Sequence, residues 1–301
     1  MLHFNRITPQ DREIYNKYLC CGEARGCEYS FVNMSVWGRQ YLAEAHGCLA
    51  LFSQFNRRTV YPFPVGSGDI KATLEAIMED AKSRGIPCRI TGLLDTDCQT
   101  LEALFPGKFR FHSDRDSFDY VYDINDLADL KGRKFQRKRN HCNRFRQEFP
   151  NYEVQPIDEA MLPQVRDLCL QWYAQKEAEN PQSDYHMEKA ALNRAMEHYS
   201  ELGLDGLALR IGDELVAFTM GSFQCCNTVD VHFEKALVES AYPVINFEFA
   251  RYLREKYPQV QYLNREDDMG LEGLRKAKLS YCPHHLVEKS WACLLEDGYD
   301  Y

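Results

Sequence analysis

The sequence predicts a mixed α/β protein made of two similar modules. Strand-like and helix-like stretches alternate along the 301 residues, and their order in the first half recurs, after a basic segment, in the second. A hydrophobic content of 45% and an aromatic content of 13% are typical of chains that bury a core. We therefore expect one module at 1–130, a connecting segment at 131–150 and a second module, which carries the site, at 151–301.

In the first half, one helix has clear signals at both ends. Asp69 precedes an amphipathic run and is its expected N-cap, while Gly85 and Pro87 mark its end. The other elements expected in this half are a helix at 11–19, strands at 47–55, 59–64 and 88–93, a helix at 97–104, and strands at 109–112 and 118–124.

The second half follows the same plan, and Asp158 caps its first long helix. The strand that ends at Glu234 leads into a helix that starts at Pro243, which predicts a parallel strand pair here. A splayed parallel pair at the centre of a sheet is a natural ligand cleft. The other elements expected here are strands at 152–156, 207–211, 215–224, 228–234, 260–263 and 285–294, and helices at 187–202 and 271–278.

The composition excludes several classes of protein. A net charge of −9 argues against a general nucleic-acid coat. The start of the chain is polar, unlike a signal peptide, and no run of 18 apolar residues could span a membrane. The 12 cysteines include no C-x-x-C spacing, which is typical of a reducing compartment and not of a zinc or thioredoxin-like site. We expect a soluble, cytoplasmic protein without a transmembrane segment or a bound metal.

Residues 131–146 form a strongly basic segment, with eight Lys and Arg residues and no acid in an otherwise acidic chain. Such a concentration of positive charge predicts a phosphate-bearing partner, either a nucleic acid, a nucleotide or a lipid head group. We expect Lys138, Arg139 and Asn140 to contact this partner. The alternative, a helix whose basic face pairs with the protein's own acids, carries equal weight.

A second charged segment, N-R-E-D-D-M-G-L-E-G-L-R-K-A-K at 264–278, directly follows an apolar strand. Side chains at the carboxyl end of a strand face the cleft of an open sheet. Glu266 or Asp268 could act as a general base for an attacking amine, and Lys276 or Lys278 could stabilise a phosphate or an oxyanion. The alternative is a capped helix with acids at its start and bases at its end, which the helix dipole favours.

Polar residues around this segment complete the candidate site. Asn264 and Arg265 open the segment, and Asn246 lies in the first turn of the preceding helix, so we expect all three to line the cleft. Asp230 and His232 are two residues apart on a strand and face the same side, where they could share a proton or orient a substrate. A satisfied polar pair on a half-exposed strand is the simpler interpretation, and it is slightly favoured.

These segments resemble a known bacterial family. The similar strings are L-K-G-R-K-F-Q-R-K-R-N-H, A-Y-P-V-I-N-F-E-F-A and Y-L-N-R-E-D-D-M-G-L-E-G-L-R-K-A-K-L-S-Y-C-P, with Y-S-F-V-N and Y-P-F-P in the first half. The family has no named function and is grouped with the C-terminal catalytic domain of phosphatidylglycerol lysyltransferases. The resemblance implies an α/β fold built as a tandem of two GCN5-related N-acetyltransferase-like modules with mixed central sheets.

The resemblance also implies a choice of donor. The family's wider relatives transfer an aminoacyl group from a charged tRNA to a lipid or a cell-wall peptide, whereas ordinary acetyltransferases of this fold hold acetyl-CoA on a Q/R-x-x-G-x-G/A loop. The corresponding residues 235–243 contain no glycine, so side chains would intervene where backbone amides should meet a pyrophosphate. This departure favours aminoacyl-tRNA over acyl-CoA. The full lysyltransferases also carry a membrane domain, whose absence here makes a lipid acceptor less certain.

Three functions remain open. The first is an aminoacyl- or acyltransferase that takes its group from a phosphate-bearing donor, aminoacyl-tRNA, to an amine or hydroxyl acceptor. The second is an acyl-CoA-dependent N-acyltransferase, and the third is a non-catalytic module that binds an anionic ligand. The expected partners are tRNA and an anionic lipid head group or small-molecule acceptor. No permanently bound cofactor is expected; aminoacyl-tRNA or acyl-CoA would act as co-substrate.

Overall fold

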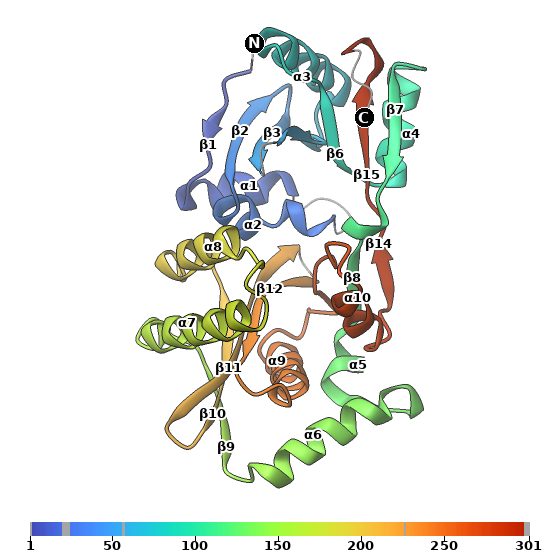
Figure 1. Ribbon diagram of the computed structural model, residues 1–301. Coiled ribbons are helices and arrows are strands. Elements are labelled where there is room, and N and C mark those ends of the chain that lie inside the picture. Colours follow the sequence, from blue (N-terminus) through green and yellow to red (C-terminus); the bar gives the residue numbers. More distant parts are fainter. Residues whose placement is uncertain (1, 20–24, 56–57, 226, 298–301) are drawn as a thin grey trace. The chain divides into compact units, whose positions relative to one another are not determined.

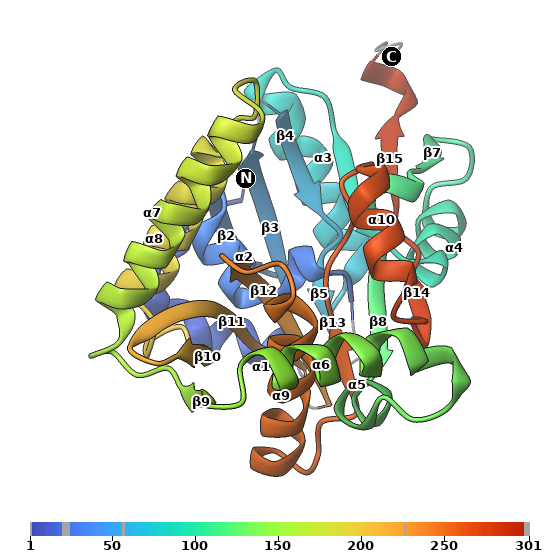
Figure 2. The same ribbon diagram turned by 60° about the horizontal axis from the view of Figure 1, so that its bottom comes forward.

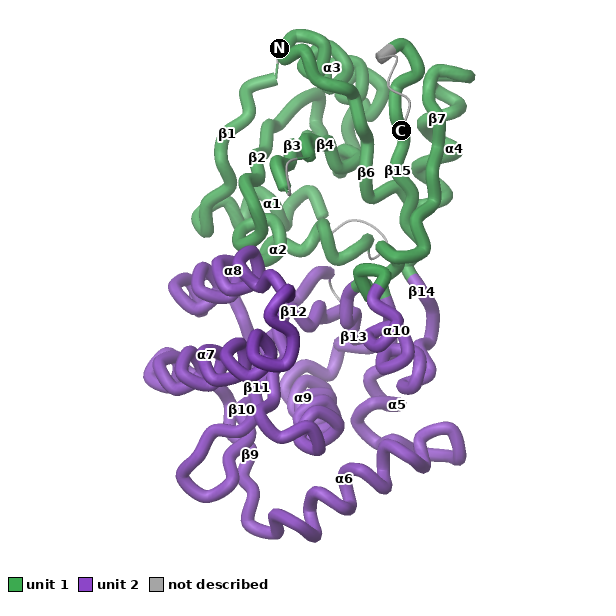
Figure 3. The backbone as a smooth tube through the Cα atoms, in the orientation of Figure 1, with its two compact units in different colours: residues 1–119, 267–270, 287–301 green, residues 120–266, 271–286 purple. Residues whose placement is uncertain are grey.

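The structure is a computed structural model that describes residues 2–19, 25–55, 58–225 and 227–297 (Figure 1). Its two compact units interleave along the chain (Figure 3). Unit 1 consists of residues 1–119, 267–270 and 287–301, and unit 2 consists of residues 120–266 and 271–286.

This division differs from the expected contiguous modules. Residues 120–130, expected in the first module, and the basic segment 131–150 both belong to unit 2, whereas residues 287–301, expected in the second module, belong to unit 1. Strand pairing is the reason, because each unit completes its sheet with a strand from the other half of the sequence.

Unit 1 is built on a mixed sheet. Its strand order is β1 (Asn5–Arg6), β2 (Arg39–Ala45), β3 (Cys48–Phe55), β4 (Arg58–Pro62), β6 (Arg89–Leu93), β15 (Ser290–Leu294) and β7 (Phe109–Ser113), and β5 (Val65–Gly66) pairs with β3. β4 and β6 run parallel, and β15 pairs antiparallel with both β6 and β7. The C-terminal strand is therefore an internal strand of this sheet.

The helices of unit 1 are α1 (Arg12–Leu19), α2 (Phe31–Val36), α3 (Ile70–Arg84) and α4 (Asp95–Leu104), with 3-10 turns at Pro9–Asp11, Cys27–Tyr29, Arg115–Ser117 and Leu295–Asp297. The predicted ends of α3 are confirmed. The Asp69 carboxylate accepts a hydrogen bond from the backbone N–H of Ala72 at 2.9 Å, and Gly85 ends the helix in the left-handed conformation that glycine adopts without strain.

Unit 2 is built on a second mixed sheet. Its strand order is β14 (His285–Val287), β8 (Asp119–Asp123), β13 (Tyr262–Asn264), β12 (Thr228–Ala236), β11 (Glu214–Cys225), β10 (Asp205–Ile211) and β9 (Tyr152–Pro156). β12 and β13 run parallel, which confirms the parallel pair predicted after Glu234. The single strand predicted at 285–294 is wrong: β14 and β15 lie in different sheets, because Glu288 and Lys289 interrupt the run.

The helices of unit 2 are α5 (Ile124–Asp129), α6 (Gln136–Glu148), α7 (Leu162–Glu179), α8 (His186–Glu197), α9 (Ala241–Lys256) and α10 (Glu272–Leu279), with a 3-10 turn at Arg133–Phe135. α9 packs against β10, β11 and β12 and is flanked by α5 and α6 (Figure 2). α7 packs on β11 and β12. None of the helices in the described part of the chain is long and apolar enough to cross a membrane.

Candidate functional site

Strand β12 of the unit 2 sheet carries a row of polar residues, Asp230, His232 and Glu234. The pairing of β12 with β11 shifts register opposite Met220 and Gly221, so the simple alternation of faces does not extend from Asp230 to Glu234. Asp230 lies opposite Asn264 in the parallel pairing with β13, so the chain that leaves β13 runs on beside this polar row. Parallel pairing thus places the predicted charged segment against the predicted Asp/His strand.

His232 links two side chains in a buried hydrogen-bond chain. Its Nδ1 lies 2.9 Å from Oε1 of Glu266, and its Nε2 lies 2.9 Å from Oγ of Ser222. Since a carboxylate only accepts, Nδ1 carries a proton, and in the neutral ring Nε2 accepts from the serine hydroxyl. The His232 side chain is 0% exposed and that of Glu266 is 22% exposed, so the Glu266 carboxylate is the end that a substrate can reach.

Sequence reasoning identified His232 and Glu266 but missed Ser222. The register of the hairpin formed by β11 and β12 could have revealed Ser222. Ser222 lies on β11 opposite Asp230, and paired residues of antiparallel strands point to the same face. The hydrogen bonds of His232 to Ser222 and Glu266 reach beyond the strand that it shares with Asp230.

The backbone of Glu266 is strained. Its φ of 58° lies in the left-handed region that residues other than glycine rarely adopt. The turn is held by the side chain of Asn264, which accepts from the Glu266 N–H at 2.8 Å, and by the Nζ of Lys278, which donates to the Glu266 carbonyl at 3.0 Å and to the Arg265 carbonyl. Tyr120 donates its N–H to the same Glu266 carbonyl at 3.2 Å. These contacts fix where the carboxylate points.

The two candidate lysines of α10 therefore differ. Lys278 is buried, and its ammonium group holds the turn through backbone carbonyls, so it positions Glu266. Lys276 is exposed on the same helix.

Arg265 lies at the centre of a cationic region in unit 2. Its guanidinium donates to Glu234 at 2.9 Å and packs over the ring of Tyr281, with 5.1 Å to the ring centroid. Asn246 lies against it and, with its amide oxygen facing the guanidinium, accepts at 3.1–3.3 Å. Lys138 of α6 stands over the same Tyr281 ring at 3.6 Å. Two cations from distant segments thus share one aromatic ring.

The environment of Lys138 destabilises its charge. Burial lowers the pKa of Lys138 to about 8, and the positive charges of Arg265 and Arg137 add to the effect. A bound anion would relieve this repulsion, so the arrangement of Lys138 and Arg265 suits a phosphate or another anionic group.

The rest of the basic segment does not gather at this point. Arg139 donates to the carbonyl oxygens of Leu130 and Gly132 and so closes the turn after α5, which differs from the expectation that it contacts a phosphate-bearing partner. Asn140 is exposed. Lys131 and Lys134 pair with acids of α5, as the alternative interpretation of the segment expected.

Asp268 does not belong to unit 2, which contains the other candidate residues. It belongs to unit 1, is 0% exposed, accepts from the N–H of Gly270 at 3.0 Å and lies 3.6 Å from Arg115. Of the two candidate bases, Glu266 is therefore the one that lies among the polar residues of unit 2.

Several backbone N–H groups between β12 and the first turn of α9 are already engaged within the chain. The backbone N–H groups of Leu237, Ala241 and Tyr242 already donate to carbonyl oxygens of the chain at 2.8, 2.9 and 3.3 Å, and Pro243 has no N–H. A cradle of the kind that binds the pyrophosphate of CoA needs such groups to be available.

Unit 1 contains a separate cavity of about 360 Å³, which sequence reasoning missed. Its wall includes Phe63 and the ion pair of Arg25 with Asp97, whose two hydrogen bonds measure 2.8 and 2.9 Å. Gly66 in the same wall has a packing role, because a Cβ there would lie 2.9 Å from Cδ1 of Tyr18.

Together, the two sheets, each with a central parallel strand pair, form a tandem α/β protein with GNAT-like modules. The sequence profile described as "Phosphatidylglycerol lysyltransferase, C-terminal" matches residues 22–293, and the chain belongs to this family.

Solved structures share the fold of this chain. A conserved protein of unknown function from Bacteroides thetaiotaomicron is 38% identical with a TM-score of 0.92, and the match covers 98% of this chain and 100% of that one. The C-terminal domain of a putative lysylphosphatidylglycerol synthetase from Agrobacterium fabrum is 12% identical with a TM-score of 0.68, covering 95% and 92%. A tandem GNAT protein from the clavulanic acid biosynthesis pathway is 8% identical with a TM-score of 0.54 and full coverage of both chains.

A curated relative also matches part of the chain. An uncharacterized protein from Mycoplasmoides gallisepticum is 25% identical over 175 residues, which are 58% of this chain and 55% of that protein. The match thus spans about half the length of that relative.

Proposed function

We propose that the protein is a transferase that moves an aminoacyl or acyl group from a phosphate-bearing donor, aminoacyl-tRNA, to an amine or hydroxyl acceptor. The observation that carries this proposal is the Ser222–His232–Glu266 chain, which ends in a partly exposed carboxylate within the same unit as the Lys138 and Arg265 cations. Family membership supports the transferase class.

In the proposed reaction, Glu266 removes a proton from the acceptor as its nitrogen or oxygen attacks the ester carbonyl of the donor. A bond forms between the acceptor and the carbonyl carbon, the ester C–O bond breaks, and the released tRNA hydroxyl takes up a proton. His232 orients the carboxylate, and Ser222 holds the imidazole in the required tautomer. Lys138 and Arg265 bind a donor phosphate.

The test is transfer of a labelled amino acid from a set of charged tRNAs to candidate acceptors, comparing the unmodified protein with Glu266→Gln. We expect label in an acceptor with the unmodified protein and its loss in the variant. Turnover that depends on an acyl-CoA, with none from any charged tRNA, would contradict the proposed donor.

The donor contact has its own test. Lys138→Gln should lower the slope of log K against log salt for tRNA binding by about one unit, because one phosphate contact is lost. Lys131→Gln is the matched control, since its side chain is 83% exposed and pairs with Asp129. Equal effects of the two substitutions would contradict a phosphate contact at Lys138.

The alternative of a binding module rests on the cation pair alone. Lys138 and Arg265 would hold an anionic ligand whether or not Glu266 acts as a base. Saturable binding of tRNA without transfer from any charged form would favour this function.

A further inference from the structure

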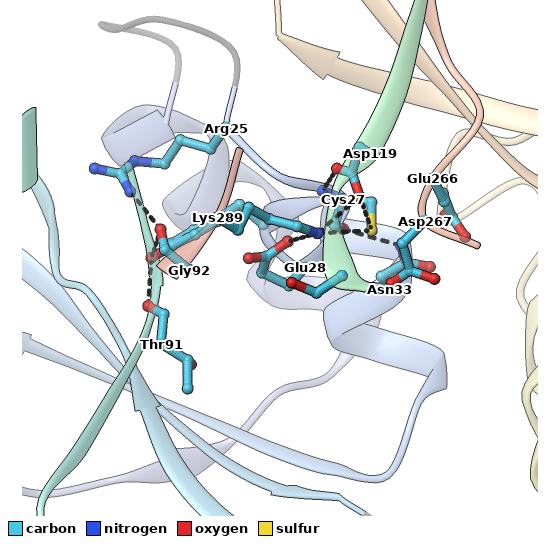
Figure 4. Close-up of polar contacts among 12 residues, drawn as sticks. Arg25, Cys27, Glu28, Asn33, Thr91, Gly92, Asp119, Glu266, Asp267 and Lys289 are labelled. Carbon is cyan, nitrogen blue, oxygen red and sulfur yellow. Dashed lines mark hydrogen bonds and ion pairs between the residues drawn. The ribbon is translucent and has the colours of Figure 1, made fainter. Parts of the chain in front are cut away.

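Unit 1 holds a buried cluster of charged side chains around Lys289, which directly precedes β15 (Figure 4). Lys289 is 6% exposed, and its Nζ lies 2.7 Å from Oδ1 of Asp119 and 2.9 Å from Oε2 of Glu28. The Sγ of Cys27 lies 3.3 Å from the same Asp119 oxygen and 3.8 Å from the Lys289 nitrogen. A thiol and an amine thus converge on one carboxylate oxygen.

Two glycines leave the space that the side chains of this cluster occupy. A Cβ on Gly26 would lie 2.4 Å from Cδ of Lys289, and one on Gly92 would lie 2.9 Å from Oε1 of Glu28. The backbone N–H of Cys27 donates to the second Asp119 oxygen at 2.6 Å, which fixes the thiol beside the lysine. The Glu28 side chain is 30% exposed and gives a small oxidant an approach to the cluster.

A metal ion is the first alternative. Cys27, Asp119 and Asp267 each offer a ligand atom, and these atoms lie within 4.8 Å of one another. However, the cluster already contains its own cation. Although burial opposes the charge, Asp119, Cys27 and Glu28 raise the pKa of Lys289 well above its usual value, so a metal would have to displace an ammonium group.

We propose that hydrogen peroxide links Cys27 covalently to Lys289. In the first step the sulfur attacks the peroxide, the O–O bond breaks, and a sulfenic acid and water result. Asp119, whose Oδ1 lies 2.7 Å from the Lys289 nitrogen, accepts one proton from the ammonium group as that nitrogen approaches the sulfur. The nitrogen attacks the sulfur, an S–N bond forms, and the sulfenic hydroxyl leaves as water with a second proton from the nitrogen. One peroxide is reduced and one thiol is oxidised, and the product is a sulfenamide.

The link would join segments that lie 262 residues apart in the sequence. Cys27 precedes α2, and Lys289 precedes the internal strand β15, so the bond would tie the end of the chain to the start of unit 1. A cross-link of this kind restricts the unfolded chain and raises the stability of unit 1.

The test is peptide mapping of the full chain after graded treatment with hydrogen peroxide, alkylation of remaining thiols and digestion with trypsin. We expect peptide 26–39 joined to peptide 279–301, with a mass two hydrogens below their sum. Trypsin should no longer cleave after Lys289, because its amine is blocked, and a thiol reductant should restore both peptides.

The second peptide contains Cys282 and Cys293, and a disulfide would lower the mass equally. A disulfide leaves Lys289 cleavable, so cleavage there overturns the proposal. Recovery of Cys27 as a free thiol or a sulfinic acid, with normal cleavage after Lys289, would also overturn it.

One variant and one internal control test whether the link requires the amine of Lys289. Lys289→Arg keeps the positive charge but cannot form the link, so Cys27 should stop at its oxidised acids. Lys235 is the internal control in the unmodified protein, because it is another buried lysine paired with an acid, Glu188, and cleavage after it should not change. Loss of cleavage at both lysines would show non-selective oxidation and overturn the proposal. If Lys289→Arg fails to fold, the mapping of the unmodified protein alone decides.

Discussion

At the scale of residues, the candidate site depends on how one histidine is held. The Nδ1 and Nε2 of His232 each have a partner at 2.9 Å, so the ring cannot rotate without breaking a buried hydrogen bond. The result is a single orientation for the Glu266 carboxylate, which a general base requires.

We predict that Glu266→Gln lowers the transfer rate by about 10²- to 10⁴-fold, because an amide cannot take up the proton of the acceptor. Donor affinity should stay the same, since Glu266 is not part of the cation pair. Ser222→Ala should lower the rate less and alter its pH profile, because it frees the imidazole tautomer without removing the base. An unchanged pH profile for Ser222→Ala would show that the serine only fills space.

The charge of Lys138 predicts a pH dependence of stability. The folded protein releases the Lys138 proton near pH 8, whereas the unfolded chain holds it to about 10.5, so between these values the unfolded state binds more protons. Stability should therefore rise through this window as the buried charge is lost. Lys138→Met should stabilise the protein at pH 7 and have little effect above pH 10.5, as measured by denaturant unfolding. Lys134→Met, at an exposed position paired with Asp126, is the matched control.

At the scale of elements, the turn after β13 is strained, so a substitution in it can raise stability while it removes activity. Only glycine adopts the φ of 58° at position 266 without strain. The turn is stabilised from outside by Asn264 and Lys278, which is typical of a site where geometry is required for activity.

Glu266→Gly should be more stable than Glu266→Ala by about 1 kcal/mol, because glycine relieves the strain in the folded backbone. Both variants should be inactive, since neither has a carboxylate. Urea unfolding of the two variants measures the difference. Greater stability of the alanine variant would mean that the turn is not strained.

The cap of α3 is a purely local feature. Asp69→Ala should lower the free energy of unfolding by about 1 kcal/mol, because the N–H of Ala72 loses its acceptor at the start of the helix. Glu75→Ala, on an exposed face of the same helix, is the matched control and should change it by less than about 0.5 kcal/mol. Equal losses in thermal unfolding would assign the effect to charge and not to capping.

At the scale of the whole molecule, both sheets need strands from both halves of the sequence. β8 belongs to the sheet of unit 2 although it precedes the basic segment, and β15 lies between β6 and β7 of unit 1 although it is the last strand of the described chain. Neither half of the sequence therefore contains a complete sheet.

Removing residues 287–301 should destabilise unit 1, because β6 and β7 lose their shared partner and Ala292 leaves the core. Limited proteolysis should then cut first within residues 1–119. The exposed substitution Glu296→Ala is the control and should leave the digestion pattern unchanged. Protection of residues 1–119 in the truncated chain would contradict an essential role for β15.

The sequence by itself determined what depends on near neighbours. Periodicity and caps located α3, and the step from an apolar strand to a helix predicted the parallel pair of β12 and β13. The same reason explains why the residues after β13 and the Asp/His pair on β12 could be recognised as site candidates. The end of a strand and alternate positions along it are local properties of the sequence.

Only the tertiary structure decided which of those residues meet. Ser222 joins His232 through the register of a hairpin, Lys138 reaches Tyr281 through the packing of α6, and Arg139 turns back to its own loop. Likewise, the run predicted as one strand at 285–294 divides between two sheets, and Cys27 meets Lys289 across nearly the whole chain. The physical reason is that contacts between distant segments form when the segments bury apolar surface against each other. No local sequence pattern indicates which distant residues will meet in this way.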